Sequence, residues 1–118
     1  MAEAHNALGE MLSIEGDANR AIQSFQRAVA AKPDLAAAQS NLGMTLLLQG
    51  RIGDAKQHLE RAIAVNPDLF EAHLNLGRAL SLEHDATGAA IHFRKAASSP
   101  DPEIRGAAGE GLKNIGLP

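Results

Sequence analysis

Apolar residues recur along this chain at spacings of three and four residues, which is the period of an α-helix. Leu42 and Leu46 lie four apart in one segment, and Ala55, Leu59 and Ala62 keep spacings of four and three in the next. Such a pattern places the apolar side chains on one face of each segment and leaves the polar side chains on the other. The pattern therefore predicts amphipathic helices.

Glycines and prolines mark the ends of these segments. Gly16 and Gly50 stand where a helix has to stop, because glycine readily adopts the left-handed conformation that closes a helix. Pro33 and Pro67 end the next segments, and the aspartate after each proline (Asp34, Asp68) is a candidate N-cap. Asp101 is a candidate cap for the last segment. We predict seven helices, near residues 3–15, 18–31, 35–49, 52–65, 69–83, 86–98 and 102–116.

The whole pattern repeats every 34 residues along the chain, and we call residues 34 apart a column. Four glycines form one column, namely Gly9, Gly43, Gly77 and Gly111. Five further columns of leucine, alanine or large apolar residues keep the same step, and Phe25, Leu59 and Phe93 form one of them. Small residues on both helices of a pair let the helices approach closely, while the large residues fill the gaps. A pair alone cannot bury its apolar face, but stacked pairs can. The chain is therefore predicted to be a repeat array.

Composition excludes several classes of protein. The 118 residues suit a single domain over 1–118, with a formal net charge of -3 and 45% apolar residues. Eleven basic residues against fourteen acidic ones do not form a nucleic-acid footprint, and zero cysteines exclude disulfides and thiol chemistry. No apolar run approaches the roughly 18 residues that span a bilayer. Residues 1–12 show no signal peptide, and the cellular compartment is left open.

The 34-residue unit resembles the tetratricopeptide repeat, whose pattern has Leu-Gly in the first helix, then Ala, a large residue, Ala and a closing Pro. The units run over 2–35, 36–69 and 70–103, followed by a cap helix over about 102–116. The resemblance implies an all-α, right-handed solenoid of antiparallel helix pairs. His84 replaces a turn glycine, so the third turn is expected to be strained or differently shaped. Four glycines in the cap helix predict that it frays most easily.

The resemblance also implies a module for protein–protein interaction, whose concave groove is lined by the first helix of each pair. The groove positions carried over from the family are Asn6, Glu10, Ser40, Asn41, Met44, Glu71, Leu74, Asn75 and Arg78. Met44 and Leu74 are expected to contact the ligand, whereas Leu48 is expected to pack between helices. The acidic residues near one end suggest a peptide or protein ligand with some basic character there.

Asn41 and Asn75 share one column, and an asparagine side chain can both donate and accept a hydrogen bond. They resemble the asparagine ladder of arrays that grip an extended backbone, although Ala7 replaces the first rung. The alternative is that both are simply solvated or bonded to a neighbouring helix. The two-carboxylate clamp of chaperone-binding members is not expected, because Glu10 and Glu71 would repel an acidic peptide terminus.

The five histidines raise the question of a metal or catalytic site. His5 and His73 replace a packing aromatic and are expected to be partly buried spacers, whereas His58 and His92 are expected on the convex outer side. Histidines of one column lie in different repeats, and neighbouring repeats are on the order of 10 Å apart. This distance is too large for one metal ion to bind two of them. No nucleophile or phosphate-binding motif is present in the sequence. We therefore predict no enzyme activity, metal or cofactor.

Two alternatives to a peptide-binding module are left open. One is that the array assembles with copies of itself by stacking through an uncovered N-terminal end, because Met1 stands almost directly before the first helix without a capping residue. The other is that the array is the non-catalytic arm of a larger enzyme, such as a glycosyltransferase.

Overall fold

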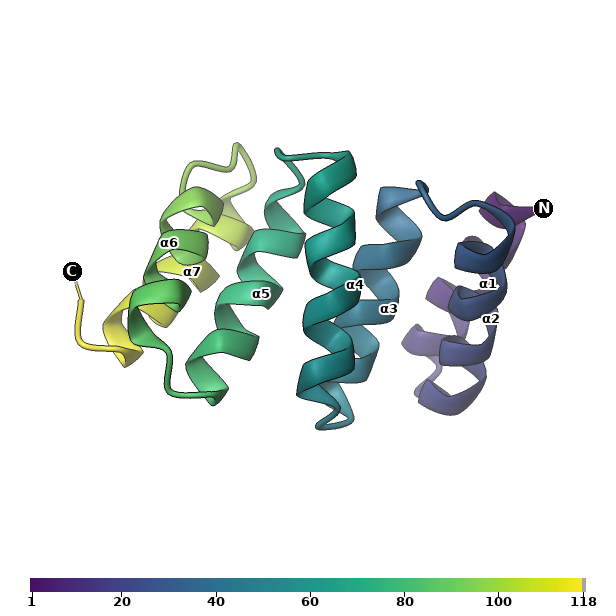
Figure 1. The fold of residues 1–118 in the computed structure, drawn as a ribbon, viewed down its shortest axis with the longest axis horizontal. Coiled ribbons are helices and arrows are strands. Elements are labelled where there is room, and N and C mark those ends of the chain that lie inside the picture. The colour runs from purple at the N-terminus through teal and green to yellow at the C-terminus, as the bar shows by residue number, and fades with distance from the viewer. Residues whose placement is uncertain (118) are drawn as a thin grey trace.

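The computed structural model describes residues 1–117, and these form seven helices and no strand (Figure 1). The helices are α1 (Ala2–Ile14), α2 (Ala18–Ala31), α3 (Ala36–Leu48), α4 (Ile52–Val65), α5 (Phe70–Leu82), α6 (Ala86–Ala96) and α7 (Pro102–Asn114). Their bounds agree with the predicted ranges to within two residues at each end. The periodicity and the punctuation by glycine and proline therefore predicted every helix.

The first six helices form a row of three antiparallel pairs, α7 packs on the last pair, and the two termini lie at opposite ends of the row (Figure 1). The described chain measures 42 × 25 × 23 Å along its principal axes. The first helices of the pairs contact one another in the order α1, α3, α5, α7, and each second helix (α2, α4, α6) packs between its own partner and the next first helix. This arrangement is an all-α helical repeat in two layers.

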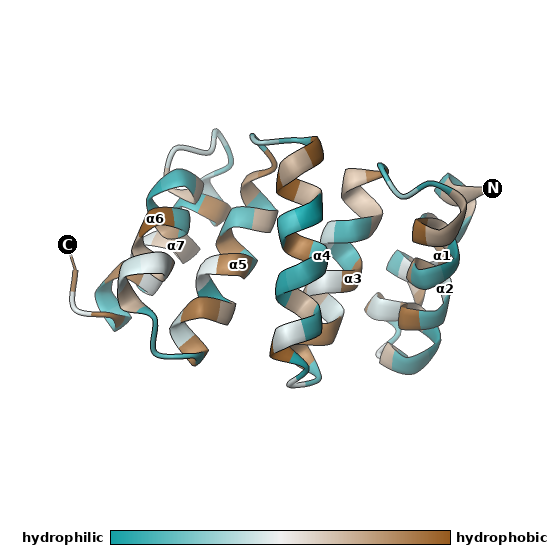
Figure 2. Cartoon of the chain, viewed as in Figure 1, coloured by the Kyte–Doolittle hydropathy of each residue, from teal (hydrophilic) through white to brown (hydrophobic). Residues whose placement is uncertain are grey.

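The core runs along the whole array. Figure 2 shows polar and apolar residues alternating along the helices, so that each helix carries both kinds. Buried side chains gather in three clusters, around Phe25 and Leu42, around Leu59 and Leu76, and around Phe93. Each cluster takes residues from at least two neighbouring helices, as expected for repeats that bury their apolar faces against each other.

The glycine column on the first helices allows the close approach that the sequence predicted. A Cβ atom added at Gly43 would lie 2.6 Å from Leu59 Cγ, and one added at Gly77 would lie 2.7 Å from Phe93 Cδ1. Atoms cannot approach so closely, so a larger residue would push the two helices of a pair apart. The small and large members of the repeat are therefore complementary.

Helix α7 departs from the repeat register. Helices α1, α3 and α5 begin at equivalent positions of their units, and the same step would start the next helix at Ile104, but α7 begins at Pro102. As a result, Gly111 meets Phe93 of the preceding helix, and Ala108 and Leu112 are the buried residues of α7. Gly111 is therefore not the structural counterpart of Gly77, although the two share a column of the sequence. The same shift explains why Glu110 stands where the sequence pattern predicts leucine.

The turns and caps match the sequence predictions in part. His84 has φ 61°, close to the 85° and 79° of Gly16 and Gly50, so the third turn keeps the shape of the others. A side chain in this conformation costs about 1–2 kcal/mol, and the turn is strained without being differently shaped. Asp101 caps α7 as predicted. The prediction for the aspartates after the prolines was wrong, because Leu35 and Leu69 occupy the N-cap positions of α3 and α5.

None of the helices in residues 1–117 has the length and apolar character needed to cross a membrane.

Candidate functional site

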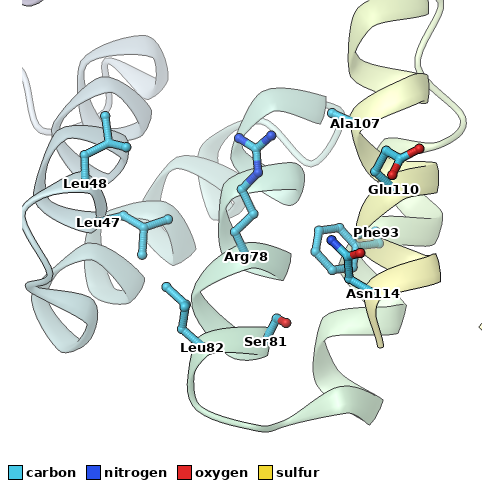
Figure 3. Close-up of a pocket in the computed structure, with 10 residues that line it drawn as sticks. Leu47, Leu48, Arg78, Ser81, Leu82, Phe93, Ala107, Glu110 and Asn114 are labelled. Carbon is cyan, nitrogen blue, oxygen red and sulfur yellow. The ribbon is translucent and has the colours of Figure 1, made fainter. Parts of the chain in front are cut away.

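A cleft of about 690 Å³ opens between α3, α5 and α7 (Figure 3). Leu47 and Leu48 line one side of it, Leu82 of α5 lies beside them, and Phe93 lines its inner part. Glu110 of α7 stands on the opposite side. Most of the lining is apolar, and we call this the apolar cleft.

The structure corrects one prediction about this cleft. Leu48 is 80% exposed and does not pack between helices, whereas its neighbour Leu47 is only 9% exposed. Successive residues of a helix point about 100° apart, and Leu48, the last residue of α3, lies beyond the buried run of Thr45, Leu46 and Leu47. Ile14, Leu48 and Leu82 are the last residues of α1, α3 and α5, share one column of the repeat, and are all exposed. This apolar row was not predicted, although its three members are spaced by the period of the repeat.

A second cleft, of about 290 Å³, lies beside the first and shares Arg78 and Ala107 with it. Three carboxylates line it, from Glu71, Asp101 and Glu103. We call it the acidic cleft, and we call the two clefts together the groove. Met44 of α3, a predicted ligand contact, also lines the acidic cleft and is half-buried.

The asparagines of the predicted ladder are bonded within the protein. Asn41 Nδ2 donates to Asn6 Oδ1 over 3.0 Å, and Asn6 Nδ2 donates to Glu10 Oε1 over 3.0 Å. Asn6 directly precedes Ala7, which occupies the asparagine column in the first repeat. Arg78 Nη1 donates to Asn75 Oδ1 over 3.2 Å. Each asparagine of the ladder therefore uses one of its two polar atoms internally.

Four of the predicted groove residues are buried, including Asn6 at 9% and Asn75 at 6% exposure. Ser40 is 4% exposed and Leu74 is 7% exposed, and Leu74 belongs to the apolar cluster that contains Phe93. They offer a ligand little surface in this structure. Glu10, Glu71 and Arg78, in contrast, are exposed.

Buried polar residues connect the two helices of a pair on the side away from the groove. Gln39 Nε2 donates to the Pro33 carbonyl over 2.9 Å, and Gln39 Oε1 lies 2.8 Å from His58 Nδ1. His73, in the same column as Gln39, makes the corresponding contacts in the next repeat. In each of two successive repeats, a polar side chain of the first helix therefore contacts both the preceding loop and the second helix.

The histidine bridge has a defined proton arrangement. His73 Nε2 lies 2.7 Å from the Pro67 carbonyl, which can only accept, so this nitrogen carries the proton. In the neutral pair, His73 Nδ1 then accepts from His92 Nδ1 over 3.0 Å. His73 and His92 belong to different columns of the repeat, so comparing residues within one column does not predict their contact. Their ring centroids are 5.3 Å apart. His73 is buried, as expected, but His58 and His92 are half-buried and not free on the outer side.

No group of three histidine, aspartate or glutamate side chains within residues 1–117 could hold a metal ion.

The half-buried histidines predict that the protein loses stability as the pH falls below about 6.5. Burial lowers the pKa of His58, assisted by Arg61, and burial lowers the pKa of His92, assisted by the neighbouring His73. The unfolded chain then binds more protons than the folded one below the ordinary histidine pKa. Each group can therefore change the unfolding free energy by at most about 1.4 kcal/mol per pH unit. Urea midpoints measured at about pH 7.5 and about pH 5.5, on either side of the ordinary histidine pKa, should fall at the lower pH.

The double variant His58→Gln/His92→Gln should remove most of this pH dependence. His84→Gln is the matched control, because His84 is exposed in a turn, and it should retain the dependence. A urea midpoint that stays constant or rises on acidification would contradict the prediction.

Comparison with known families identifies the repeat. Two tetratricopeptide repeat profiles match the chain, one over residues 1–68 and the other over residues 40–103. The chain therefore belongs to the tetratricopeptide repeat family. No curated protein sequence matches it.

Solved structures show the same fold. The first repeat domain of Spaghetti (RPAP3), bound to the HSP90 peptide SRMEEVD, has a TM-score of 0.87 and 17% identity, covering 97% of this chain and 89% of that one. The Sgt2 domain from Aspergillus fumigatus has a TM-score of 0.83 and 22% identity, covering 97% and 76%. The P58(IPK) domain has a TM-score of 0.88 and 27% identity, covering 97% of this chain and 32% of that one.

Proposed function

We propose that this protein is a non-catalytic interaction module that binds an extended peptide or a partner helix in the groove. The observation that carries the proposal is the apolar cleft, in which Leu48 and Leu82, 80% and 59% exposed, line one cavity together with Leu47 and Phe93. Exposed apolar surface in a cleft commonly marks a binding site. Membership of a family of interaction modules supports the same conclusion.

The asparagine column supplies hydrogen-bonding groups next to the clefts. Within residues 1–117, Asn41 Oδ1 and Asn75 Nδ2 take part in no side-chain hydrogen bond. In our proposal Asn41 accepts from a ligand N–H, and Asn75, which is 6% exposed but lines the acidic cleft, donates to a ligand carbonyl. Neighbouring repeats are on the order of 10 Å apart, which corresponds to about three residues of an extended chain. The two asparagines therefore hold the ligand backbone at two points, Asn75 within the acidic cleft and Asn41 one repeat before it.

The peptide bound by the first repeat domain of Spaghetti (RPAP3) is a poor guide to this ligand. That HSP90 peptide, SRMEEVD, ends in an acidic sequence. In the present chain Glu10 and Glu71 are exposed where the clamp for such a terminus needs polar or basic groups. Like charges brought together at an interface weaken binding. We therefore propose a ligand other than an acidic peptide terminus.

Replacing both ladder asparagines tests the groove as the binding site. Peptides are first selected on the immobilised protein from a random library, and their affinities are expected to be micromolar. Asn41→Ala/Asn75→Ala should weaken them by about tenfold or more, because each hydrogen bond contributes about 0.5–1.5 kcal/mol. Titration calorimetry measures the change, and circular dichroism checks that the variant is folded.

Asn19→Ala is the control, since Asn19 is exposed on α2 in the other layer. It should leave the affinities within about twofold. Equal affinities of the wild-type protein and the ladder variant would show that the asparagines do not hold the ligand.

A second function, self-assembly through the end formed by α1, is favoured by one comparison between repeats. Leu8 is 42% exposed and Met11 is 59% exposed, whereas their counterparts Leu42 and Thr45 are only 1% and 4% exposed. The preceding repeat covers those counterparts, and in residues 1–117 nothing covers the same face of α1. In this second proposal, another copy of the chain covers it.

Light scattering on a dilution series, read by refractive index, tests this assembly. We expect the mass to rise with concentration, and we expect Leu8→Lys/Met11→Lys to hold it at one chain. Leu82→Lys, an equally exposed leucine on the groove, serves as the control and should still assemble. A wild-type mass of one chain at every concentration would rule the second function out.

A further inference from the structure

We infer that the groove accepts a cationic amphipathic segment of a partner protein, with apolar side chains in the apolar cleft and Lys or Arg side chains in the acidic cleft. This inference rests on the proposed function of the groove and specifies the chemistry of its ligand. The clefts adjoin, because Arg78 and Ala107 line both of them. One short segment can therefore occupy the two at once.

The apolar cleft provides the anchor. Leu48 and Leu82 stand on its rim, largely exposed, and Leu47 and Phe93 lie deeper, at 9% and 2% exposure. A cleft of about 690 Å³ is in the range of sites that enclose several side chains or a small ligand. A leucine-sized side chain placed there would cover the exposed leucines and rest on the ring of Phe93.

The acidic cleft selects the charge. Its three carboxylates, from Glu71, Asp101 and Glu103, share the lining with a single cation, Arg78, which is bonded to Asn75. The ion pairs found in residues 1–117 all lie elsewhere, so none of these carboxylates is neutralised by a neighbouring side chain. A basic side chain would supply the missing positive charge. An acidic one would add a further negative charge and be repelled.

The two kinds of surface lie along opposite edges of the groove. Glu71 and Glu103 belong to the first turns of α5 and α7, whereas Leu48 and Leu82 are the last residues of α3 and α5. Along one helix, the first and last turns are about 16 Å apart at roughly 1.5 Å per residue. A ligand that runs across these helices therefore meets carboxylates along one edge and leucines along the other. Only a segment with a basic side and an apolar side matches both edges.

Synthetic peptides test the inference directly. The probes are eight-residue peptides of leucine and lysine with one added tryptophan, in an alternating order that suits a strand and in a helical order. The matched counterparts carry glutamate in place of lysine. The chain contains no Trp and no Tyr, so tryptophan fluorescence reports on the peptide alone. We expect at least one lysine peptide to bind at least tenfold more tightly than its glutamate counterpart, and its affinity to fall with added salt.

Variants of each edge assign the binding to the two clefts. Glu71→Gln/Glu103→Gln and Leu48→Ser/Leu82→Ser should each weaken the lysine peptide by about tenfold. The matched controls are Glu15→Gln/Glu60→Gln and Val65→Ser/Ile91→Ser, which change exposed residues that line neither cleft. These controls should leave the affinity within about twofold. All the substituted side chains are at least partly exposed, so the variants are expected to fold.

The failure of this inference is distinguishable from the failure of the proposed function. If the library peptides depend on Asn41 and Asn75 but are acidic or uncharged, the groove binds peptides and the inferred ligand chemistry is wrong. Equal binding of the lysine and glutamate peptides overturns it as well, as does a lysine peptide that responds to the edge variants no more than to their controls. If neither the library peptides nor the lysine peptides respond to any groove variant, both proposals fail.

Discussion

Replacing Phe93 by alanine should lower the free energy of unfolding by about 3–5 kcal/mol, the usual range for a buried phenylalanine. Phe93 is 2% exposed and belongs to the cluster that joins α5, α6 and α7. Its ring lies against both Gly77 and Gly111, where an added Cβ atom would come within 2.7 Å and 2.6 Å of it. Backbone surrounds the ring on two sides, so the helices cannot easily close the resulting cavity.

Urea denaturation followed by circular dichroism measures this effect. A domain of this size has about 5–15 kcal/mol of stability in total, so the loss should be visible as a large shift of the midpoint. Phe70→Ala is the matched control, because the ring of Phe70 is half-buried and meets Lys95 Nζ 5.6 Å from its centroid. It should lose clearly less stability. A loss at Phe93 no larger than that at Phe70 would mean that the repeats can collapse around the cavity.

A double-mutant cycle isolates the contact between the ring and the glycine. Gly77→Ala alone should destabilise the protein by about 1–3 kcal/mol, because the added methyl group overpacks the contact with Phe93. In the Phe93→Ala background the same substitution should cost much less, since the ring is gone. The two effects should therefore be non-additive by about 1 kcal/mol or more. Additive effects would show that the close approach does not depend on the ring.

Gln39→Ala should lower the free energy of unfolding by about 2–4 kcal/mol, the second largest effect that we expect. The side chain is 1% exposed and bridges the Pro33 carbonyl and His58. Removal creates a cavity and leaves the partners of two hydrogen bonds unsatisfied, at about 1–3 kcal/mol for a buried polar group.

Gln57→Ala is the control for this prediction, since Gln57 is exposed on α4. It should change the stability by no more than about 0.5 kcal/mol. Gln39→Glu adds a further test, because a carboxylate can still accept from His58 but cannot donate to Pro33. It should lie between the alanine variant and the wild-type protein at neutral pH. If Gln39→Ala behaves like the control, the bridge contributes little to stability.

Local rules were sufficient to predict the helices. Gly16 and Gly50 close helices in the left-handed conformation that glycine adopts without strain, and the structure shows positive φ at both. The contacts of Gly43 with Leu59 and of Gly77 with Phe93 follow from the columns of the repeat. These features are recoverable because they depend on residues close in the chain or one repeat apart.

The site was predicted less completely. Leu74 and Leu48 look alike in the sequence, but the first is buried and the second is 80% exposed. Leu48 is exposed like Ile14 and Leu82 of its column, whereas Leu74 is buried against α7, which begins at Pro102 where the repeat register would begin it at Ile104. The same packing places Glu103 of α7 in one cleft with Glu71. A pattern read column by column has no means of detecting such a change.

The sequence by itself determined that this chain is an array of tetratricopeptide repeats, because helical period, helix ends and small-to-large pairing are properties of residues at fixed spacings. Only the tertiary structure decided which surface the array offers. His73 meets His92 across two columns, and the carboxylates of Glu71 and Glu103 share a cleft although their helices follow different registers. Such neighbours result from how each helix is rotated and displaced against the next. That rotation depends on the sum of many packing contacts and not on any one spacing in the chain.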